Sequence, residues 1–327
     1  MNLFETDKCI PVCLPHYEIV NDDLVFMKFR KKNLAAELVG TFAKINNSSN
    51  LEILMKKGVR KELIQQLIDK KCVILVNSVE KHISAERILI LAPHVDDTAF
   101  ALGGYVSKYI GEKNFYIVNV FGKQDYTLYW NNYESSRKKA YPQEEERIFC
   151  RAANIEQMYL WDYPDAPLRK LYQHHSYMNT SDSTGWIIQQ EASLLRQITA
   201  SINKVVNEIQ PDYVFCPLGI GKHVDHILVR QACFNLKLPC EKMLFYEDMP
   251  YSISFNRVNV IEEIQKIYNA TLIKEECDIT LDIKRKRDFV NIYQSQLMGF
   301  QMKAIIDYSI RGNENEKIAV ENLWKFS

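Results

Sequence analysis

The chain has 327 residues, of which 47% are hydrophobic, so it can bury a large core in one or two domains. It carries 41 basic and 41 acidic side chains, and its zero formal net charge excludes a strong overall field for nucleic acid or anionic membrane. No apolar run approaches the roughly 20 residues of a membrane span, and we find no signal peptide. The cysteines are scattered without a Cys-x-x-Cys pair, as is typical of free thiols in a reducing compartment. Composition therefore predicts a soluble, cytoplasmic protein with no nucleic-acid partner.

Residues 1–80 are separable by pattern from the rest of the chain and predict a small accessory module. Apolar periodicity indicates, in order, a strand at 24–29, helices at 33–45, 49–55 and 59–68, and a strand at 73–76. Helices followed by a strand within about 55 residues favour a winged-helix-like module. Its lysines could meet phosphates, but the acidic side chains among them favour a solvated helix face.

From about residue 87 onward, short apolar runs alternate with helical stretches. The runs that predict strands lie at residues 88–91, 115–121, 158–161, 213–216 and 243–246, and helices are expected between them. Strands that alternate with helices indicate βαβ units. We therefore predict an α/β domain over residues 81–327, with a Rossmann-like, doubly wound and mostly parallel sheet.

The first polar motif follows the strand at 88–91. His94, Asp96 and Asp97 arrive together where this strand gives way to a helix. In open α/β sheets, ligands bind outside the carboxyl ends of the strands. The two aspartates alone are equally compatible with capping the helix, because carboxylates suit its free N–H groups. A cap, however, needs only one carboxylate and has no use for the histidine.

A second motif, PLGIGKHVDH at residues 217–226, follows the strand at 213–216 in the same way. Its two glycines permit an irregular loop that delivers His223 and His226 to the same sheet edge. His94, Asp97 and His226 can then converge on one metal ion, with an open position as in catalytic zinc sites. The alternative is that these imidazoles lie at a helix start by chance. The occurrence of two such motifs after two strands makes this alternative much less favourable.

These segments resemble the PIG-L/LmbE-like zinc-dependent N-deacetylases, in the branch with a Pro-His-x-Asp-Asp motif. The similarity rests on PHVDD at 93–97, PLGIGKHVDH at 217–226, YEDMPY at 246–251, and Lys286 followed by YQSQ at 293–296. It covers roughly residues 86–300. This chain departs from the family pattern with Val95 in place of proline and Thr98 in place of glutamate, which removes a carboxylate beside the ligands.

The resemblance implies a role for each site residue, and each role is chemically sensible. His94, Asp97 and His226 bind Zn²⁺, although Fe²⁺ or Co²⁺ also suits such nitrogen and oxygen ligands. Asp96 acts as the general base and later protonates the leaving amine. His223 donates to the oxyanion, and Asp225 is expected to fix the tautomer of His223.

Residues that contact the substrate are harder to predict. Asp162 and Asp165 follow a strand and could hold sugar hydroxyls, but the turn around a nearby proline explains them almost as well. Arg137 could meet an anionic group, whereas loop arginines are more commonly solvated. Glu247 and Asp248 follow the strand at 243–246 and are expected at the pocket floor.

The sequence therefore predicts a zinc-dependent hydrolase that removes an N-acetyl or other N-acyl group from an acetamido sugar or amino-sugar-containing metabolite, in biosynthesis. The alternative is a non-catalytic protein that senses a sugar and carries a regulatory winged-helix module. Hydrolysis by paired carboxylates without metal is disfavoured because the two aspartates are neighbours in sequence rather than on opposite sides of a bond. The pattern does not determine the oligomeric state.

Overall fold

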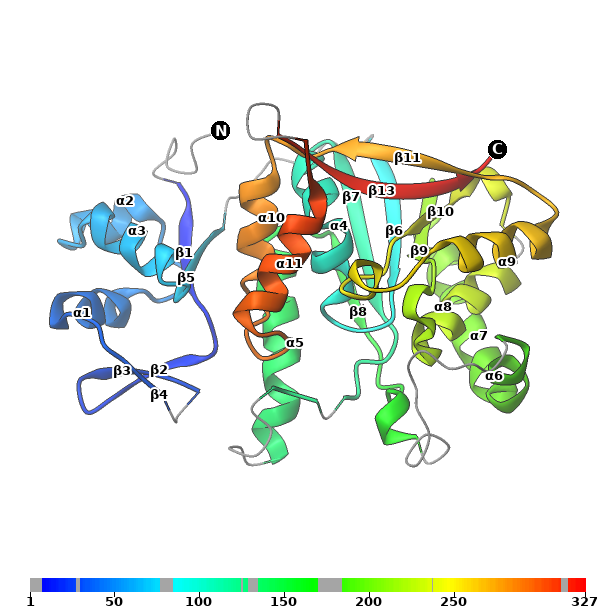
Figure 1. Cartoon of the computed structure of the whole chain (residues 1–327). Coiled ribbons are helices and arrows are strands. Elements are labelled where there is room, and N and C mark those ends of the chain that lie inside the picture. Colours follow the sequence, from blue (N-terminus) through cyan, green and yellow to red (C-terminus); the bar gives the residue numbers. More distant parts are fainter. Residues whose placement is uncertain are drawn as a thin grey trace.

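The computed structural model describes residues 8–27, 30–76, 85–124, 126–128, 135–169, 184–236, 238–312 and 317–327, without the side chains of residues 135–139. Within these residues, no helix combines the length and the apolar character that crossing a bilayer requires. The described chain forms a large α/β body with a smaller N-terminal module at one side (Figure 1).

An eight-stranded sheet forms the centre of the large body, with the strand order β11-β13-β10-β9-β6-β7-β8 and β12 paired with β13. The parallel strands are β6 (Glu86–Ala92), β7 (Lys113–Asn119), β8 (Gln157–Leu160), β9 (Tyr213–Pro217) and β10 (Met243–Tyr246). The antiparallel strands are β11 (Leu272–Asp278), β12 (Ile310–Arg311) and β13 (Ile318–Phe326). The predicted α/β fold with a mostly parallel sheet is confirmed.

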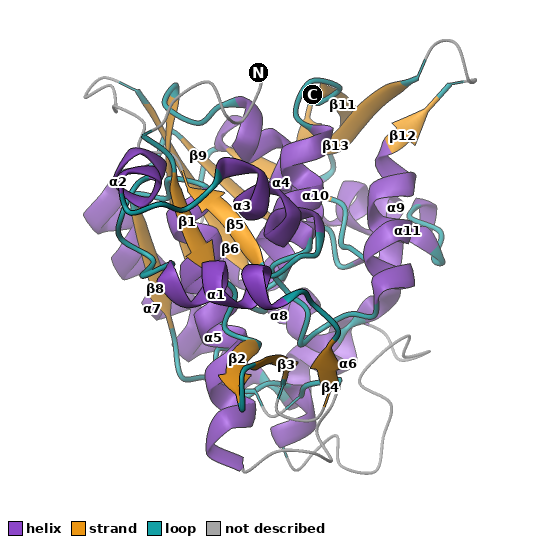
Figure 2. Ribbon diagram, turned by 90° about the vertical axis from the view of Figure 1, so that its left-hand side faces the viewer, coloured by secondary structure: helices purple, strands orange, loops and turns teal. Residues whose placement is uncertain are grey.

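Helices cover both faces of this sheet (Figures 1 and 2). One face carries α4 (Asp97–Lys108), α5 (Ser135–Ala152), α10 (Ile283–Val290) and α11 (Gly299–Ser309). The other carries α6 (Thr184–Gln190), α7 (Ala192–Ile209), α8 (Val224–Asn235) and α9 (Val258–Tyr268). Short 3₁₀ turns are η2 (Ala166–Leu168), η4 (Ile220–Lys222), η5 (Cys240–Lys242) and η6 (Tyr251–Ile253). Two separate hydrophobic clusters, one on each face, stabilise this three-layer arrangement.

The strand order places a topological switch point between β6 and β9. From β6 the chain moves outward through β7 and β8, and it then returns to β9 on the other side of β6. The side chains of residues 88–91 in β6 are fully buried, which is typical of a central parallel strand covered on both faces. A crevice is expected where the connections diverge, at the carboxyl ends of β6 and β9. Both polar motifs begin at these two strand ends.

The N-terminal module contains two small sheets and three helices. Strand β1 (Ile10–Cys13) pairs with β5 (Val73–Val76), and β2 (Tyr17–Val20), β3 (Asp23–Phe26) and β4 (Arg30–Lys32) form a meander. The helices α1 (Ala36–Lys44), α2 (Leu51–Lys56) and α3 (Lys61–Asp69) follow β4 and precede β5 in the chain. Helices followed by a strand match the expected order, whereas the meander was predicted only through its middle strand. The winged-helix assignment stays a prediction.

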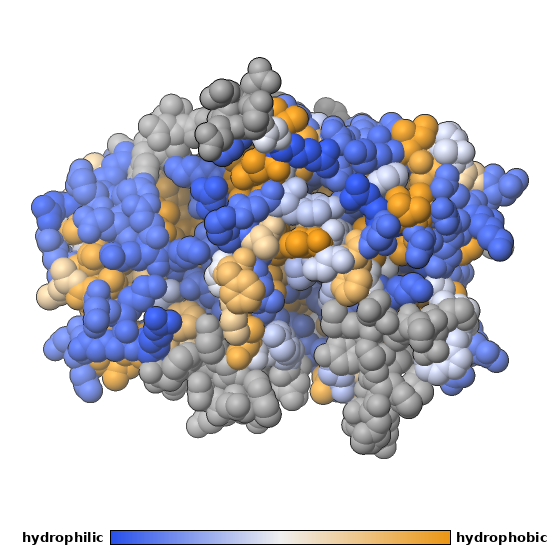
Figure 3. Space-filling model, in the orientation of Figure 1, coloured by the Kyte–Doolittle hydropathy of each residue, from blue (hydrophilic) through white to orange (hydrophobic). Residues whose placement is uncertain are grey.

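The module shares a core with the large body. A single hydrophobic cluster contains Phe42 and Leu67 of the module together with Phe149 of α5 and Phe289 of α10. Hydrophilic residues cover most of the module on the face shown in Figure 3. The predicted boundary between residues 80 and 81 lies outside the described residues, which leave out 77–84.

Candidate metal centre

The first strand end places His94 beside Asp97. Helix α4 begins at Asp97, whose Oδ2 accepts a hydrogen bond of 2.8 Å from the backbone N–H of His94. The Nδ1 atom of His94 lies 3.5 Å from the same carboxylate oxygen. Asp96 occupies the N-cap position, but its side chain makes no capping hydrogen bond in the described structure. Helix capping therefore does not account for Asp96, whose half-buried carboxylate lines a cavity.

The second strand end delivers two imidazoles. After β9 the chain turns through Gly219 and Gly221, which have φ angles of 83° and 80°. Only glycine adopts such angles without strain, and a side chain at Gly221 would also collide with Tyr251, 2.8 Å away. His223 then caps α8, its Nδ1 accepting from the backbone N–H of Asp225 at 3.2 Å. One turn further along α8, His226 is fully buried.

The two strand ends converge as expected from the sequence. Ligand atoms of His94, Asp97 and His226 all lie within 4.8 Å of one another, a spacing that one ion can bridge. The Nε2 atom of His226 lies 3.6 Å from Oδ1 of Asp97. This nitrogen is buried and has no hydrogen-bond partner among the described residues. A buried nitrogen lone pair aimed at a carboxylate is costly unless a cation lies between them, so these residues fit a divalent metal ion.

Carboxylates behind the imidazoles determine which nitrogen of His226 and of His94 faces the candidate metal site. Asp248 lies 2.5 Å from Nδ1 of His226, and Asp225 lies 3.1 Å from Nε2 of His94. The carboxylates fix the tautomers, so that His226 presents Nε2 and His94 presents Nδ1 to the shared site. Such carboxylate–imidazole pairs are the usual outer support of a bound metal.

Asp225 acts on His223 through its backbone N–H, whereas its carboxylate has other partners. Its carboxylate lies 4.0 Å from Nδ1 of His223, too far for a hydrogen bond. Instead it accepts from His94, from the backbone N–H of Ala166 at 2.9 Å, and pairs with Arg169 at 2.7 Å. A second group of possible ligands, His94, His223 and Asp225, is also close enough to hold an ion. Because the Asp225 carboxylate is already engaged by His94, Ala166 and Arg169, we favour the group that contains Asp97.

The charges of the centre favour a cation. Desolvation opposes ionisation of Asp97, but the imidazoles of His226 and His94 outweigh it and lower the pKa of Asp97. Desolvation likewise opposes a charged ring at His94, yet its acidic partners Asp225 and Asp97 raise the pKa of His94 well above its ordinary value. Positive charge at this point is thus stabilised, whether a proton or a metal ion supplies it.

The surroundings raise the pKa of Asp96 and lower the pKa of His223. Desolvation and the neighbouring Asp97 raise the pKa of Asp96 to about 7. Burial holds the pKa of His223 well below its ordinary value, although Asp225 acts in the opposite direction. His223 is therefore a neutral imidazole, and because Nδ1 accepts from Asp225, its proton sits on Nε2.

A cavity of about 310 Å³ opens over the centre, large enough for part of a small-molecule ligand. Its polar lining comes from several segments: His94, Asp96, Asp97, Gln124, Tyr126, Asp165, His223, Tyr251, Gln296 and Gln301. The predicted substrate residue Asp165 is among them, and burial raises its pKa to about 6. Its side chain also caps η2 by accepting from Leu168.

Of the other predicted substrate residues, Asp162, Glu247 and Asp248 do not line this cavity. Asp162 is exposed and is not part of the cavity lining, and the side chain of Arg137 lies outside the described part of the chain. Asp248 supports His226 and accepts from two backbone N–H groups of the second motif, so it is not a floor residue. Glu247 points away and is buried among Tyr308, Asn322 and Trp324, each of which donates to it.

Sequence reasoning missed several cavity residues and two supporting roles. Tyr251 and Gln296 lie in the motifs YEDMPY and YQSQ, so the resemblance pointed to their segments without giving their functions. Gln124 and Gln301 lie outside those motifs, and no local pattern marked them. The support of His94 by Asp225 joins positions 131 residues apart, which no sequence spacing could indicate.

The fold and the site together define an α/β protein with a candidate metal centre at the switch point of its sheet. Residues 89–237 match the family model PIG-L, described as GlcNAc-PI de-N-acetylase. They contain both ligand motifs, and this match confirms the resemblance seen in the sequence.

Individual relatives agree with this assignment. The chain is 24% identical over 234 residues to 2′-N-acetylparomamine deacetylase of Streptomyces fradiae, covering 69% of this chain and 79% of that protein. A deacetylase from teicoplanin biosynthesis is similar in structure, with a TM-score of 0.57 and 18% identity over 74% of this chain and 98% of that one. The zinc-inhibited form of a teicoplanin deacetylase gives a TM-score of 0.56 at 17% identity, over 74% and 98% of the two chains. At this identity the structural matches support the fold.

Proposed function

We propose that the protein is a metal-dependent N-deacetylase that hydrolyses the acetamido group of an amino sugar or amino-sugar-containing metabolite during biosynthesis. The observation that carries the proposal is the buried, unpartnered Nε2 of His226, which faces Asp97 beneath a cavity lined by Asp96 and His223. The family of residues 89–237 supports the reaction. The paromamine and teicoplanin deacetylases support an amino-sugar substrate from a biosynthetic pathway.

In this proposal, His94, Asp97 and His226 hold the ion. A bound Zn²⁺, Fe²⁺ or Co²⁺ would polarise the amide carbonyl and lower the pKa of a water from about 15.7 toward about 7. Zinc is our first choice because two imidazoles, one carboxylate and an open position suit it. The teicoplanin deacetylase that is similar in structure also exists in a zinc-inhibited form, so the ion must be determined directly for this chain.

Asp96 carries the proton in the proposed reaction. Its carboxylate lines the cavity and makes no capping bond within the described structure, so it is available to a water molecule beside the amide. It accepts a proton as the water oxygen bonds to the carbonyl carbon, and it returns that proton to the nitrogen as the C–N bond breaks. The products are acetate and a free amine. A pKa near 7 suits a group that must perform both steps.

His223 stabilises negative charge in the same proposal. Its Nδ1 is occupied as an acceptor by the backbone of Asp225, so Nε2 carries the hydrogen. The ring lines the cavity and is neutral, which makes it a hydrogen-bond donor to the developing oxyanion.

A cytoplasmic location and a winged-helix character of the module complete the proposal. The location rests on the cysteines, all eight of which are free thiols.

Metal analysis combined with a substrate screen tests this function. The full chain should contain about one divalent ion and should release acetate from at least one acetamido-sugar conjugate. Chelation should abolish release, and adding back single ions should restore it with a preference that identifies the metal. A protein that binds amino sugars but contains no ion and releases no acetate would contradict the proposal and favour the sugar-sensing alternative.

A further inference from the structure

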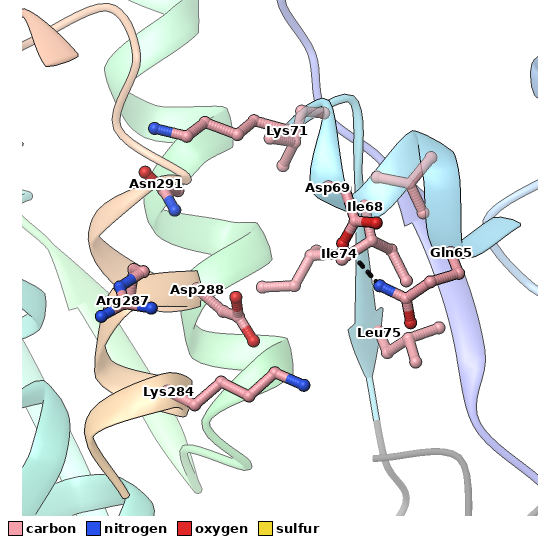
Figure 4. Close-up of a pocket in the computed structure, with 12 residues that line it drawn as sticks. Gln65, Ile68, Asp69, Lys71, Ile74, Leu75, Lys284, Arg287, Asp288 and Asn291 are labelled. Carbon is pink, nitrogen blue, oxygen red and sulfur yellow. Dashed lines mark hydrogen bonds between the residues drawn. The ribbon is translucent and has the colours of Figure 1, made fainter. Parts of the chain in front are cut away.

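The N-terminal module meets the large body in two different ways. Along α10, a cleft separates it from the body, lined by Asp69 and Lys71 of the module and by Asp288 of α10 (Figure 4). Side chains of both signs line this cleft, so it offers no single chemical character to a ligand. Elsewhere in the interface, the turn between β1 and β2 places His16 against α5, where the residue is 1% exposed.

His16 is held in one orientation. Its ring stacks on Tyr141 of α5, with centroids 5.8 Å apart and an interplanar angle of 22°, and it lies 5.9 Å from the ring of Phe26. Its backbone carbonyl accepts from the N–H of Met27 at 2.6 Å. The Nε2 atom lies 2.5 Å from Oε1 of Glu145, a fully buried carboxylate 129 residues away in sequence. This is a specific contact between the module and the body.

Glu145 connects His16 to the wall of the cavity. Its Oε1 accepts from the backbone N–H of Ser295 at 2.8 Å, and its Oε2 accepts from the Ser295 hydroxyl at 2.6 Å. The side chain of Gln296, which lines the cavity together with Asp96, donates to the same hydroxyl at 2.7 Å. Ser295 also accepts from the backbone N–H of Leu128, two residues beyond the cavity residue Tyr126.

The directions of these hydrogen bonds are determined by the donors. The N–H and O–H groups of Ser295 both donate to Glu145, so Glu145 acts as an acceptor-only carboxylate. Nδ1 of His16 is buried and has no partner among the described residues, so the proton is best placed on Nε2, facing Glu145. A buried carboxylate that loses one of its donors is destabilised, and it will shift or draw in water to compensate.

We propose that His16 is a positioning residue for the candidate active site, acting through Glu145 to hold the Ser295–Gln296 wall of the substrate cavity. The proposal rests on the proposed function only for the nature of the substrate. The module is then part of the enzyme's substrate-binding apparatus, although it lies outside the family-matched residues 89–237. Because the wall lies beside the substrate and contains none of the proposed ligands, its displacement should weaken binding more than turnover.

Two amide replacements in the full-length protein separate this role from simple packing. His16→Gln can place an amide N–H near the original Nε2 position and retain the bond to Glu145, whereas His16→Asn is too short to reach it. Hydrogen exchange of the Ser295 and Leu128 amides reports on the wall without any assay of activity. We expect both amides to exchange about tenfold faster in His16→Asn and at nearly the wild-type rate in His16→Gln. Equal exchange in the two variants would overturn the proposal.

Steady-state kinetics provide the second readout. In His16→Asn, KM should rise about tenfold while kcat changes by less than about twofold, as expected for lost uniform binding. Arg151→Ala is the matched control, because it removes another hydrogen bond between body and module, to the carbonyl of Asn47, at an exposed position. A similar rise of KM in Arg151→Ala would overturn the specific role of His16.

Ser295→Ala tests the same connection from the cavity side, should His16→Asn fail to fold. It removes the hydroxyl that joins Glu145 to Gln296 and should raise KM severalfold; an unchanged KM would contradict the proposal. If the wild-type protein releases no acetate from any acetamido sugar, the proposed function fails. Hydrogen exchange then still decides whether His16 holds the wall.

Discussion

Among the described residues, buried carboxylate–imidazole pairs occur in two regions, and these regions are built in opposite ways. At the sheet edge, His226 gives one nitrogen to Asp248 and leaves the other aimed at Asp97 without a partner among the described residues. At the module interface, Glu145 receives several donors, and the free nitrogen of His16 lies among aromatic rings.

The difference indicates function. Acceptors that converge with no donor between them require a cation, as at the sheet edge. Donors that converge on one acceptor satisfy it completely and need no further ligand, as at Glu145. Neither His16 nor Glu145 belongs to a possible metal-binding group among the described residues. A buried histidine beside an acid is therefore informative only when the whole hydrogen-bond network is known.

The largest expected effect separates the two regions directly. Replacing His226 with Ala removes a ligand from the sheet edge, so bound metal should fall from about one ion per chain to background, and acetate release should be lost with it. His16→Ala should keep its full metal content, because no ligand is altered. Metal analysis after gel filtration measures both. Full metal retention in His226→Ala would show that the ion binds elsewhere.

Asp96→Asn should give the next largest effect. The change keeps the size of the side chain but removes its ability to accept a proton, so turnover should fall by about 10²–10⁴. Metal content should stay at the wild-type level, because Asp97 rather than Asp96 faces His226. Single-turnover acetate release with matched metal analysis checks both expectations. Loss of metal would mean that the roles of the two aspartates are reversed.

The neighbours Glu247 and Asp248 offer a matched pair of intermediate effect. Asp248→Asn weakens the support of His226, and loss of such outer support typically costs about 10–100-fold in metal affinity or activity. Glu247→Gln alters a carboxylate that bonds to Tyr308, Asn322 and Trp324 instead, so metal affinity should change by less than about twofold. Competition with a chelator measures both affinities. Equal losses would contradict the assignment of Asp248.

The smallest effect concerns stability at the module interface. His16→Ala removes a donor from a buried carboxylate and should lower the free energy of unfolding by about 1–3 kcal/mol. Arg151→Ala, at an exposed contact of the same interface, should change it by less than about 0.5 kcal/mol. Urea denaturation followed by tryptophan fluorescence compares the variants. Indistinguishable stabilities would show that the His16–Glu145 pair is not a dominant contact.

Local pattern was sufficient for much of the fold. The apolar run at 88–91 predicted the central strand β6, and the stripe at 59–68 predicted α3, because burial on one or both faces leaves a periodic trace in the sequence. Pattern was weaker where burial was incomplete. The apolar pattern over 187–209 predicts one long helix, but the structure has two, α6 and α7, separated at Glu191. The strands β1 and β2 were not expected at all.

The sequence by itself determined which side chains are available: two strand ends, each followed by histidines and aspartates, and hence the candidate ligand group His94, Asp97 and His226. It could do so because parallel strands present their carboxyl ends at one edge.

Only the tertiary structure decided how those groups are oriented. The Asp225 carboxylate contacts His94 rather than His223, and Asp248 supports His226. Its neighbour Glu247 points to the opposite side and bonds to Asn322. His16 was joined to Glu145 across 129 residues. Hydrogen-bond partners depend on side-chain direction and on contacts between distant segments, and these exist only once the chain has packed.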